Sequence, residues 1–175
     1  MSKIIETNRL RLRRFKISDA EAIFSNYATD EKVTKYLTWT VHPNIEVTKS
    51  LLTSWIKEDD EFEPNVTRFA ITLKDKDEVI GSIDLVRHTE EEIGYVLSRN
   101  YWNQGIMSEA LKAFLLYLKE IGYKKMTIKA DVDNISSNKV ITKNGGIFIK
   151  NEEMFLKSKN KTRTLNCYYF DLLNI

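Results

Sequence analysis

The stretch that decides the fold of this 175-residue chain is EIGYVLSRNYWNQGIMSEALKAFLLYLKE, residues 92–120. Apolar residues alternate with polar or small ones from Glu92 to Leu97, which predicts a strand. A polar loop leads from this strand to Gly105. From there apolar residues recur at helical spacing and predict a strongly amphipathic helix that ends near Gly122.

The next part of the chain predicts a strand–helix–strand crossover. Alternating apolar residues from Met126 to Val132 predict a strand, and 135–143 predicts a short helix that Gly145-Gly146 ends. Two further strands are expected at about 147–155 and 164–172. A crossover joins strands that run in the same direction, so we expect its two strands to be parallel neighbours.

The first half of the chain predicts a strand and three helices. The strand is expected from Arg9 to Phe15. The helices begin near Ser18, Asp30 and Asn44, residue types that favour helix starts. Ser18 and Glu21 have the spacing of a capping box, in which each side chain bonds the other residue's backbone N–H.

After residue 64 the hydrophobic period changes to two. Segments at 69–73 and 79–87 read as a hairpin that turns at 75–77. Together these elements predict an α+β fold with a mixed, mostly antiparallel sheet of about seven strands flanked by helices. The length suits a single domain that spans residues 1–175.

The composition is that of an ordinary globular protein. Its 27 Lys+Arg against 25 Asp+Glu leave a formal net charge of +2, which argues against a nucleic-acid partner. Cys167 has no second cysteine to bond, and with His42 and His88 as the two histidines no metal centre is expected. The early charges of Lys3 and Glu6 exclude a signal-peptide core, and no apolar run approaches the ~20 residues that span a bilayer. We therefore expect a cytoplasmic protein with no membrane partner.

The loop before Gly105 has the layout of a phosphate-binding site. A helix start leaves about four backbone N–H groups unpaired and carries about half a positive charge. Glycine permits a positive φ or the close approach of a ligand. The glycine patterns of dinucleotide and nucleoside-triphosphate loops are absent from the sequence. By itself the feature is weak, because a single glycine before a helix is more often a plain turn.

Several segments, in consistent order over about the whole chain, resemble the GNAT acetyltransferases and in particular the branch of ribosomal-protein N-terminal acetyltransferases. They are ETNRLRLR (6–13), VIGSI (79–83), EIGY (92–95), Trp102 with GIMSEAL (105–111), and NISSNKVITKNG (134–145). The resemblance implies the GNAT fold, whose sheet splays where acetyl-CoA binds. It also implies acetyl-CoA as the cosubstrate and no metal.

The resemblance implies which residues hold acetyl-CoA. Loop amides would bind the diphosphate, from the residues Asn103, Gln104, Gly105, Ile106, Met107 and Ser108. Met107 stands where the family usually has glycine or alanine. The pantetheine arm would add alongside Tyr95, Val96 and Leu97, with one backbone N–H facing the thioester oxygen. Asn134 would bond the pantetheine amides, a role compatible with capping the helix that it begins.

The implied reaction needs a base for the amine and help for the leaving thiolate. Ser137 is expected to reach the sulfur; the alternative is that it only caps a helix amide. Glu92 is the candidate base, and an ordinary sheet-edge carboxylate is the alternative. Many superfamily members carry a tyrosine acid at the position that is Ile141 here. Carboxylates near the expected acceptor groove predict a cationic amine: Asp84, Glu92, Glu152 and Glu153.

The sequence thus predicts an N-acetyltransferase that moves an acetyl group from acetyl-CoA to a primary amine by direct attack in a ternary complex. By resemblance that amine is a protein N-terminus. A small-molecule acceptor (a polyamine, an aminoglycoside or another xenobiotic amine) and a non-catalytic CoA-binding module remain alternatives. The sequence leaves the acceptor and the oligomeric state open, a homodimer included.

Overall fold

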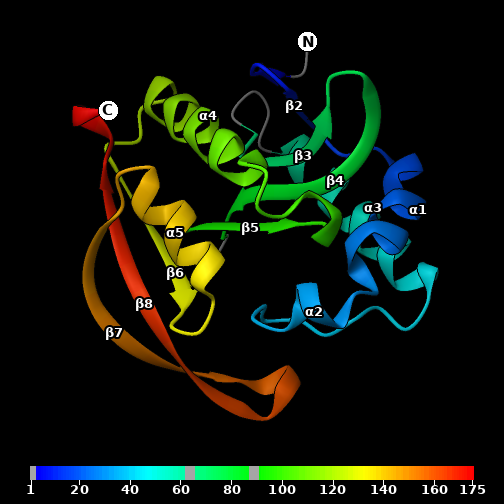
Figure 1. Cartoon of the computed structure of the whole chain (residues 1–175). Coiled ribbons are helices and arrows are strands. Elements are labelled where there is room, and N and C mark those ends of the chain that lie inside the picture. The colour runs from blue at the N-terminus through cyan, green and yellow to red at the C-terminus, as the bar shows by residue number, and fades with distance from the viewer. Residues whose placement is uncertain (1–2, 62–65, 87–90) are drawn as a thin grey trace.

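The computed structural model describes residues 3–61, 66–86 and 91–175 (Figure 1). The end of the predicted hairpin strand at Arg87, and His88, lie outside the described residues.

A five-stranded antiparallel sheet forms one half of the molecule. Its order is β1-β2-β3-β4-β5, with β1 Ile5–Glu6, β2 Leu10–Arg13, β3 Arg68–Leu73, β4 Lys76–Leu85 and β5 Ile93–Leu97. The predicted hairpin is β3–β4, but it turns earlier than expected, because Leu73 already pairs with Lys76.

A three-stranded antiparallel sheet forms the other half, with β6 Lys125–Asp131, β7 Ile147–Leu156 and β8 Lys161–Asp171 in the order β6-β8-β7. The expectation of parallel neighbours is therefore wrong. The crossover strands β6 and β7 do run in the same direction, but β8 lies between them and pairs antiparallel with both. The long β7–β8 hairpin pairs locally, and its second strand fills the place beside β6.

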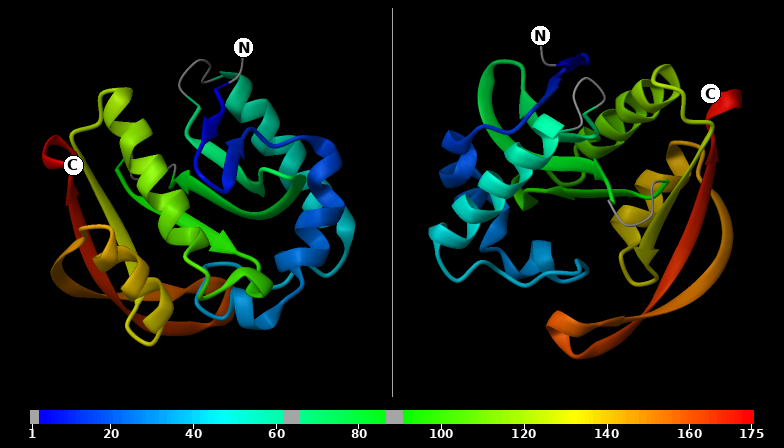
Figure 2. Two further views of the ribbon diagram at one scale, coloured as in Figure 1. Left: turned by 45° about the horizontal axis from the view of Figure 1, so that its top comes forward. Right: turned by 180° about the vertical axis from the view of Figure 1, so that it is seen from behind.

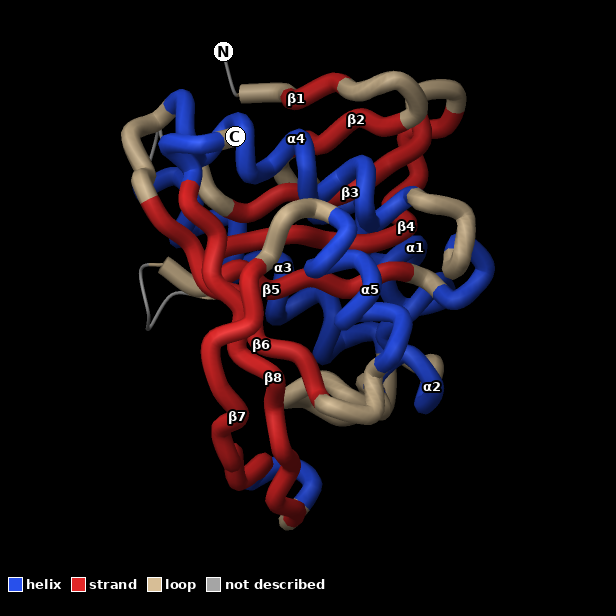
Figure 3. The backbone as a smooth tube through the Cα atoms, turned by 60° about the vertical axis from the view of Figure 1, so that its left-hand side comes forward, coloured by secondary structure: helices blue, strands red, loops and turns tan. Residues whose placement is uncertain are grey.

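The two sheets meet where β5 and β6 begin. Glu92 and Thr127 form a parallel bridge, and the Thr127 amide donates to the Glu91 carbonyl at 2.7 Å. Beyond this point the strands separate, and the two sheets leave the junction in different directions (Figure 3). The predicted α+β fold with an open, splayed sheet is confirmed.

Helices cover both faces of the five-stranded sheet (Figure 2). One face carries α4 Ile106–Glu120, with α5 Ile135–Lys143 beside it. The other carries α1 Ala20–Ile23, α2 Glu31–Thr34 and α3 Ile45–Glu61. Short helical turns complete the chain: η1 Ile17–Asp19, η2 Phe24–Ala28, η3 Arg99–Tyr101, η4 Lys157–Lys159 and η5 Leu172–Asn174.

Helix starts follow the predicted residue types at two of three places. Asp30 accepts from the Lys32 amide, and the Asn44 side chain accepts from amides in the first turn of α3. The capping box at Ser18 is wrong. The Asp19 carboxylate instead accepts from the Lys16 amide at 2.7 Å and forms a bidentate ion pair with Arg13 at 2.9 Å. Both side chains of this pair are buried, so neither is free to act elsewhere.

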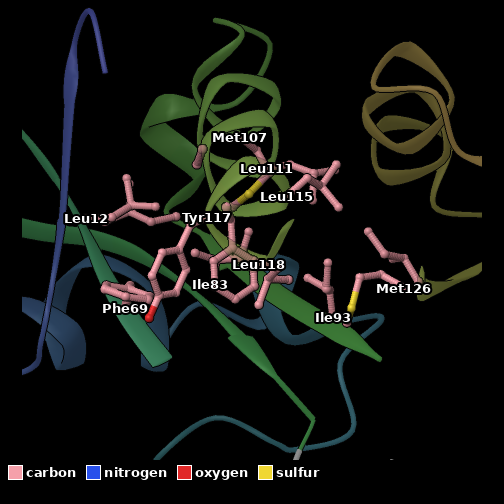
Figure 4. Close-up of a cluster of buried hydrophobic side chains, with 14 of the residues drawn as sticks. Leu12, Phe69, Ile83, Ile93, Met107, Leu111, Leu115, Tyr117, Leu118 and Met126 are labelled. Carbon is pink, nitrogen blue, oxygen red and sulfur yellow. The ribbon is translucent and has the colours of Figure 1, made fainter. Parts of the chain in front are cut away.

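The main core lies between α4 and the sheet. Leu111, Phe114 and Leu118 from α4 are fully buried against strand residues that include Phe69 and Ile83 (Figure 4). A second cluster packs under the N-terminal helices around Phe15, Ile23, Tyr27 and Leu52. The sheet is thus fixed from both sides, which leaves the separating ends of β5 and β6 as the place where ligands can enter.

Candidate active site

Two cavities lie on opposite sides of the gap between β5 and α5. The first, here called the loop-side cavity, has a volume of about 650 Å³ and runs from the loop at Trp102–Ser108 to the start of α5. The second, here called the chamber, has a volume of about 840 Å³ and lies between residues 36–42, α3 and the β7–β8 hairpin. Six residues line both: Tyr36, Leu37, Tyr95, Val96, Asn134 and Ser137.

The loop brings backbone amides to the wall of the loop-side cavity. Gly105 precedes α4 with φ +73°, a left-handed conformation that favours glycine. Asn103 is also left-handed, with φ +58°. Among the predicted loop residues, Asn103, Gly105, Ile106, Met107 and Ser108 line this cavity. Gln104 does not; its carbonyl accepts from Arg9 and its side chain donates to Asn100.

The N-terminal segment clasps this loop, a feature that sequence reasoning missed. Glu109, in the first turn of α4, accepts from the Thr7 hydroxyl at 2.6 Å and from the Arg9 amide and guanidinium at 2.8 and 2.7 Å. Burial alone would raise the pKa of Glu109, but the bonds from Thr7 and Arg9 outweigh it and hold that pKa below the usual value. Both ends of the clasp stand in segments that carried the family resemblance, yet nothing in the sequence pairs them.

The exposed edge of β5 turns backbone groups toward the gap. The Ser98 amide donates to Ile80 of β4, and the Leu97 carbonyl, pointing the other way, accepts from the Trp102 indole at 2.9 Å. Because successive residues of a strand alternate in direction, the amides of Leu97 and Tyr95 point into the gap. The Val96 amide points toward β4, so Val96 meets the cavities through its side chain.

Helix α5 presents its first turn to the same gap. Asn134 caps it by accepting from the Ser137 amide at 3.2 Å. The Ser137 hydroxyl is not a cap; it lies 2.7 Å from the Tyr95 hydroxyl. Burial raises the pKa of Tyr95 to about 12, with the hydrogen bond to Ser137 acting in the opposite direction. Tyr95 therefore stays protonated and can donate to Ser137 near neutral pH.

Position 141 faces the core, not the gap. Ile141 is fully buried beside Gly146 and Phe170 and lines neither cavity. An acid at this position would thus lie away from both cavities. The Tyr168 hydroxyl is already engaged within the protein, because it donates a hydrogen bond to the Asn138 side chain at 2.6 Å. The α5 residue that lines both cavities lies one turn earlier, at Ser137.

Charged side chains line the chamber in pairs. Glu92 lies 3.5 Å from Lys129, and Asp131 pairs with Arg163. Burial would lower the pKa of Lys129, but a hydrogen bond to Glu152 and the charge of Glu92 outweigh it and raise that pKa. Of the four carboxylates expected near the acceptor, Glu92 and Asp84 line the chamber, whereas Glu152 and Glu153 do not.

Neither cavity is built around metal ligands. Within residues 3–61, 66–86 and 91–175, no three His, Cys, Asp or Glu side chains come together as a metal site. In those same ranges no helix has the length and apolar character to cross a membrane.

Comparison with known proteins identifies the family. An acetyltransferase (GNAT) domain model matches residues 9–147. The chain is 31% identical to an uncharacterized N-acetyltransferase, p20 of Bacillus licheniformis, over 95% of this chain and 94% of that one.

Two solved structures share the fold. A GNAT-family acetyltransferase from Bacillus anthracis has a TM-score of 0.82 at 24% identity, covering 98% of this chain and 99% of that one. RimL, a ribosomal L7/L12 alpha-N-protein acetyltransferase solved with coenzyme A, has a TM-score of 0.80 at 22% identity, covering 97% and 98% of the two chains. With the family model matched over most of its length, this chain belongs to the GNAT acetyltransferases.

Proposed function

We propose that the protein transfers an acetyl group from acetyl-CoA to a primary amine by direct attack in a ternary complex. The observation that carries this proposal is the meeting of the two cavities at Tyr95 and Ser137. One cavity has the layout of a phosphate-binding site, and the other lies on the opposite side of this meeting point. Two substrates entering from opposite sides would touch there.

The loop-side cavity fits acetyl-CoA, which would supply an activated acyl thioester. The amides of the α4 first turn and the left-handed Gly105 leave a backbone surface for a diphosphate. The amides of Tyr95 and Leu97 suit a peptide-like pantetheine arm. Four lysines line the cavity and match the negative charge of the nucleotide end: Lys32, Lys35, Lys139 and Lys143. RimL, with the same fold, is known in complex with coenzyme A.

Ser137 would support the departing sulfur, and Tyr95 would support Ser137. A phenol with a pKa of about 12 does not give its proton outright to a thiolate whose conjugate acid has a pKa near 8.5. Tyr95 would instead donate a hydrogen bond to Ser137, which turns the serine proton toward the sulfur. An amide from Tyr95 or Leu97 would stabilise the charge that develops on the acyl oxygen.

Glu92 is our candidate for the group that removes the proton from the amine. It lines the chamber, on the acceptor side of the gap. Lys129 holds its carboxylate in place at 3.5 Å. The amine would enter through the chamber, and the proton would pass to Glu92 directly or through water.

A protein N-terminal amine is the acceptor that the family branch suggests, and the printed activity of RimL supports it. A CoA-binding module without catalysis would need only the loop-side cavity, so the second, connected cavity favours an enzyme.

The deciding experiment measures free thiol released from acetyl-CoA over a panel of peptides and small primary amines. Release that depends on the amine supports the proposal. Tight binding of acetyl-CoA with no amine-dependent release would show a binding module instead.

A further inference from the structure

Aromatic side chains dominate the wall of the chamber on the side of the N-terminal helices. Trp55 of α3 packs against Phe15 with ring centroids 5.2 Å apart, and Trp39 lies 5.3 Å from the His42 ring. Tyr27 and Tyr36 line the same space. Aliphatic residues fill much of the rest of the wall: Ile23, Leu37, Val47, Leu51, Met154 and Leu156. This lining suits a flat apolar group.

Carboxylates outnumber cations around the chamber. Four carboxylates, Glu58, Asp84, Glu92 and Asp131, face three cations, Arg68, Lys129 and Arg163. Glu58 lies 3.5 Å from Arg68, which also stands across from Asp84 in the β3–β4 register. Burial lowers the pKa of His42, which keeps this residue neutral near pH 7. Further carboxylates pair with the same cations, Asp59 with Arg68 at 3.3 Å and Glu152 with Lys129 at 3.1 Å, so negative charge remains for a cationic amine.

The hairpin tip is tied across the chamber to the end of α2. Ser158 donates to the Thr38 carbonyl at 2.7 Å, and Lys159 donates to the carbonyls of Lys35, at 3.3 Å, and Thr34. The chamber is lined by residues on both sides of this tie, Leu37–Trp39 and the strands that flank the tip. The tie is therefore part of the wall. The volume of the chamber, about 840 Å³, is in the range of small-molecule sites.

From these three observations we infer that the acceptor is a compact primary amine with a flat, apolar body, such as an arylalkylamine. This inference rests on the proposed acetyl transfer, and for its acceptor it favours a small-molecule amine over the protein N-terminus that the likeness to RimL suggests. The aryl body would lie against Trp39 and the neighbouring apolar wall, with its amine directed to Tyr95 and Ser137.

The test compares kcat/KM for acetyl transfer to phenethylamine and tryptamine with that for n-butylamine, spermidine and a short peptide with an N-terminal serine. We expect the arylalkylamines to exceed each of the others by about tenfold or more, equivalent to ~1.4 kcal/mol. Equal or better turnover of spermidine, the peptide or n-butylamine would overturn this inference and leave acetyl transfer standing. Acetyl-CoA binding without turnover of any amine would overturn both.

A matched pair of variants tests the wall itself. Trp39→Ala should reduce the preference for phenethylamine over n-butylamine by about tenfold, a typical loss for a large aromatic contact. Trp39→Phe should retain most of it. Phe148→Ala removes an aromatic ring that is 52% exposed and lines neither cavity, and should leave the preference unchanged. An unchanged preference in folded Trp39→Ala, shown by a wild-type KM for acetyl-CoA, would contradict the assigned role of this wall.

Discussion

The hydroxyls of Tyr95 and Ser137 lie 2.7 Å apart, where the loop-side cavity and the chamber meet. One comes from the edge strand β5 and the other from the first turn of α5, 42 residues later in the chain. The contact therefore joins the two sides of the splayed sheet at the place where the acyl group would be transferred. Each of the two hydroxyls therefore has a proposed role that a variant without it can test.

Ser137→Ala should lower kcat by about a hundredfold, the low end of what help to a leaving group is worth. The KM for acetyl-CoA should change little, because in the proposed site backbone amides, not Ser137, hold the diphosphate. Steady-state kinetics with a thiol reagent measure both quantities. Ser54→Ala on exposed α3 is the control and should match the wild type. Wild-type turnover in folded Ser137→Ala, with chemistry rate-limiting, would remove Ser137 from the mechanism.

Tyr95→Phe keeps the ring and removes only the hydroxyl. We expect kcat to fall by about tenfold, the worth of one hydrogen bond of ~1.4 kcal/mol. The double variant with Ser137→Ala should cost no more than Ser137→Ala alone, because Tyr95 acts through Ser137. Since the pKa of Tyr95 is raised to about 12, its loss should not alter the shape of the pH–rate profile between pH 6 and 9. Additive losses in the double variant would show independent roles.

Gly105→Val should weaken CoA binding by more than about tenfold, or ~1.4 kcal/mol. A branched side chain is strained at φ +73°, and its Cβ would meet the Arg9 guanidinium at 3.4 Å, so the substitution would displace the loop amides that line the cavity. Gly122→Val is a matched control, because Gly122 also has a positive φ, of +102°, but lies beyond the far end of α4. Calorimetry and thermal melts on both variants separate the two effects. Equal CoA affinity in the two variants would place the diphosphate elsewhere.

The sequence patterns predicted those parts of the fold that depend on residues close together in the chain. The amphipathic period of α4, the β3–β4 hairpin and the Asn134 cap all follow from residues close together in the chain. The strand order β6-β8-β7 does not, because β8 enters beside β6 from 30 or more residues away and no spacing encodes that choice. Asp19, and not Ser18, is the capping group, and its carboxylate also forms an ion pair with the buried Arg13.

The candidate site also has parts that the sequence predicted and parts that it did not. The loop and the first turn of α5 carry recognisable segments, and these place Gly105, Asn134 and Ser137 at the loop-side cavity. The clasp of Arg9 on Glu109 spans 100 residues and has no sequence signal. The chamber wall likewise comes from a turn, a helix and a hairpin that are joined only by folding. For this reason the resemblance indicated the cosubstrate clearly and the acceptor poorly.

Glu109→Gln should destabilise the protein by about 1–2 kcal/mol at pH 7, because the carboxylate accepts charge-assisted hydrogen bonds in the clasp. Its folded-state pKa lies below the usual 4.5, so its contribution is present above pH 4.5 and is lost as the pH falls through the folded value. The stability gap between wild type and variant should therefore close in acid. Urea unfolding from pH 3 to pH 7 measures it.

The same helix supplies the control for that measurement. Glu120 is 65% exposed and pairs with Lys3 on the surface, and Glu120→Gln should cost less than about 0.5 kcal/mol at any pH. If the two variants behaved alike, the clasp would contribute no more than a surface ion pair.

Glu92→Gln tests the base by removing the charge while keeping the shape. With a carboxylate beside it, an ammonium substrate can lose its proton within the site, so the rate falls only gradually as the pH drops below the amine's pKa. Without that carboxylate only amine already neutral in solution can react. The kcat/KM of the variant should then fall more steeply, approaching about tenfold per pH unit. Profiles of kcat/KM for the amine between pH 6 and 10 measure the change.

Glu152→Gln is the matched control, because Glu152 also bonds Lys129, at 3.1 Å, but does not line the chamber. A wild-type slope in Glu92→Gln would assign the proton to water and leave Glu92 as a partner for Lys129 alone.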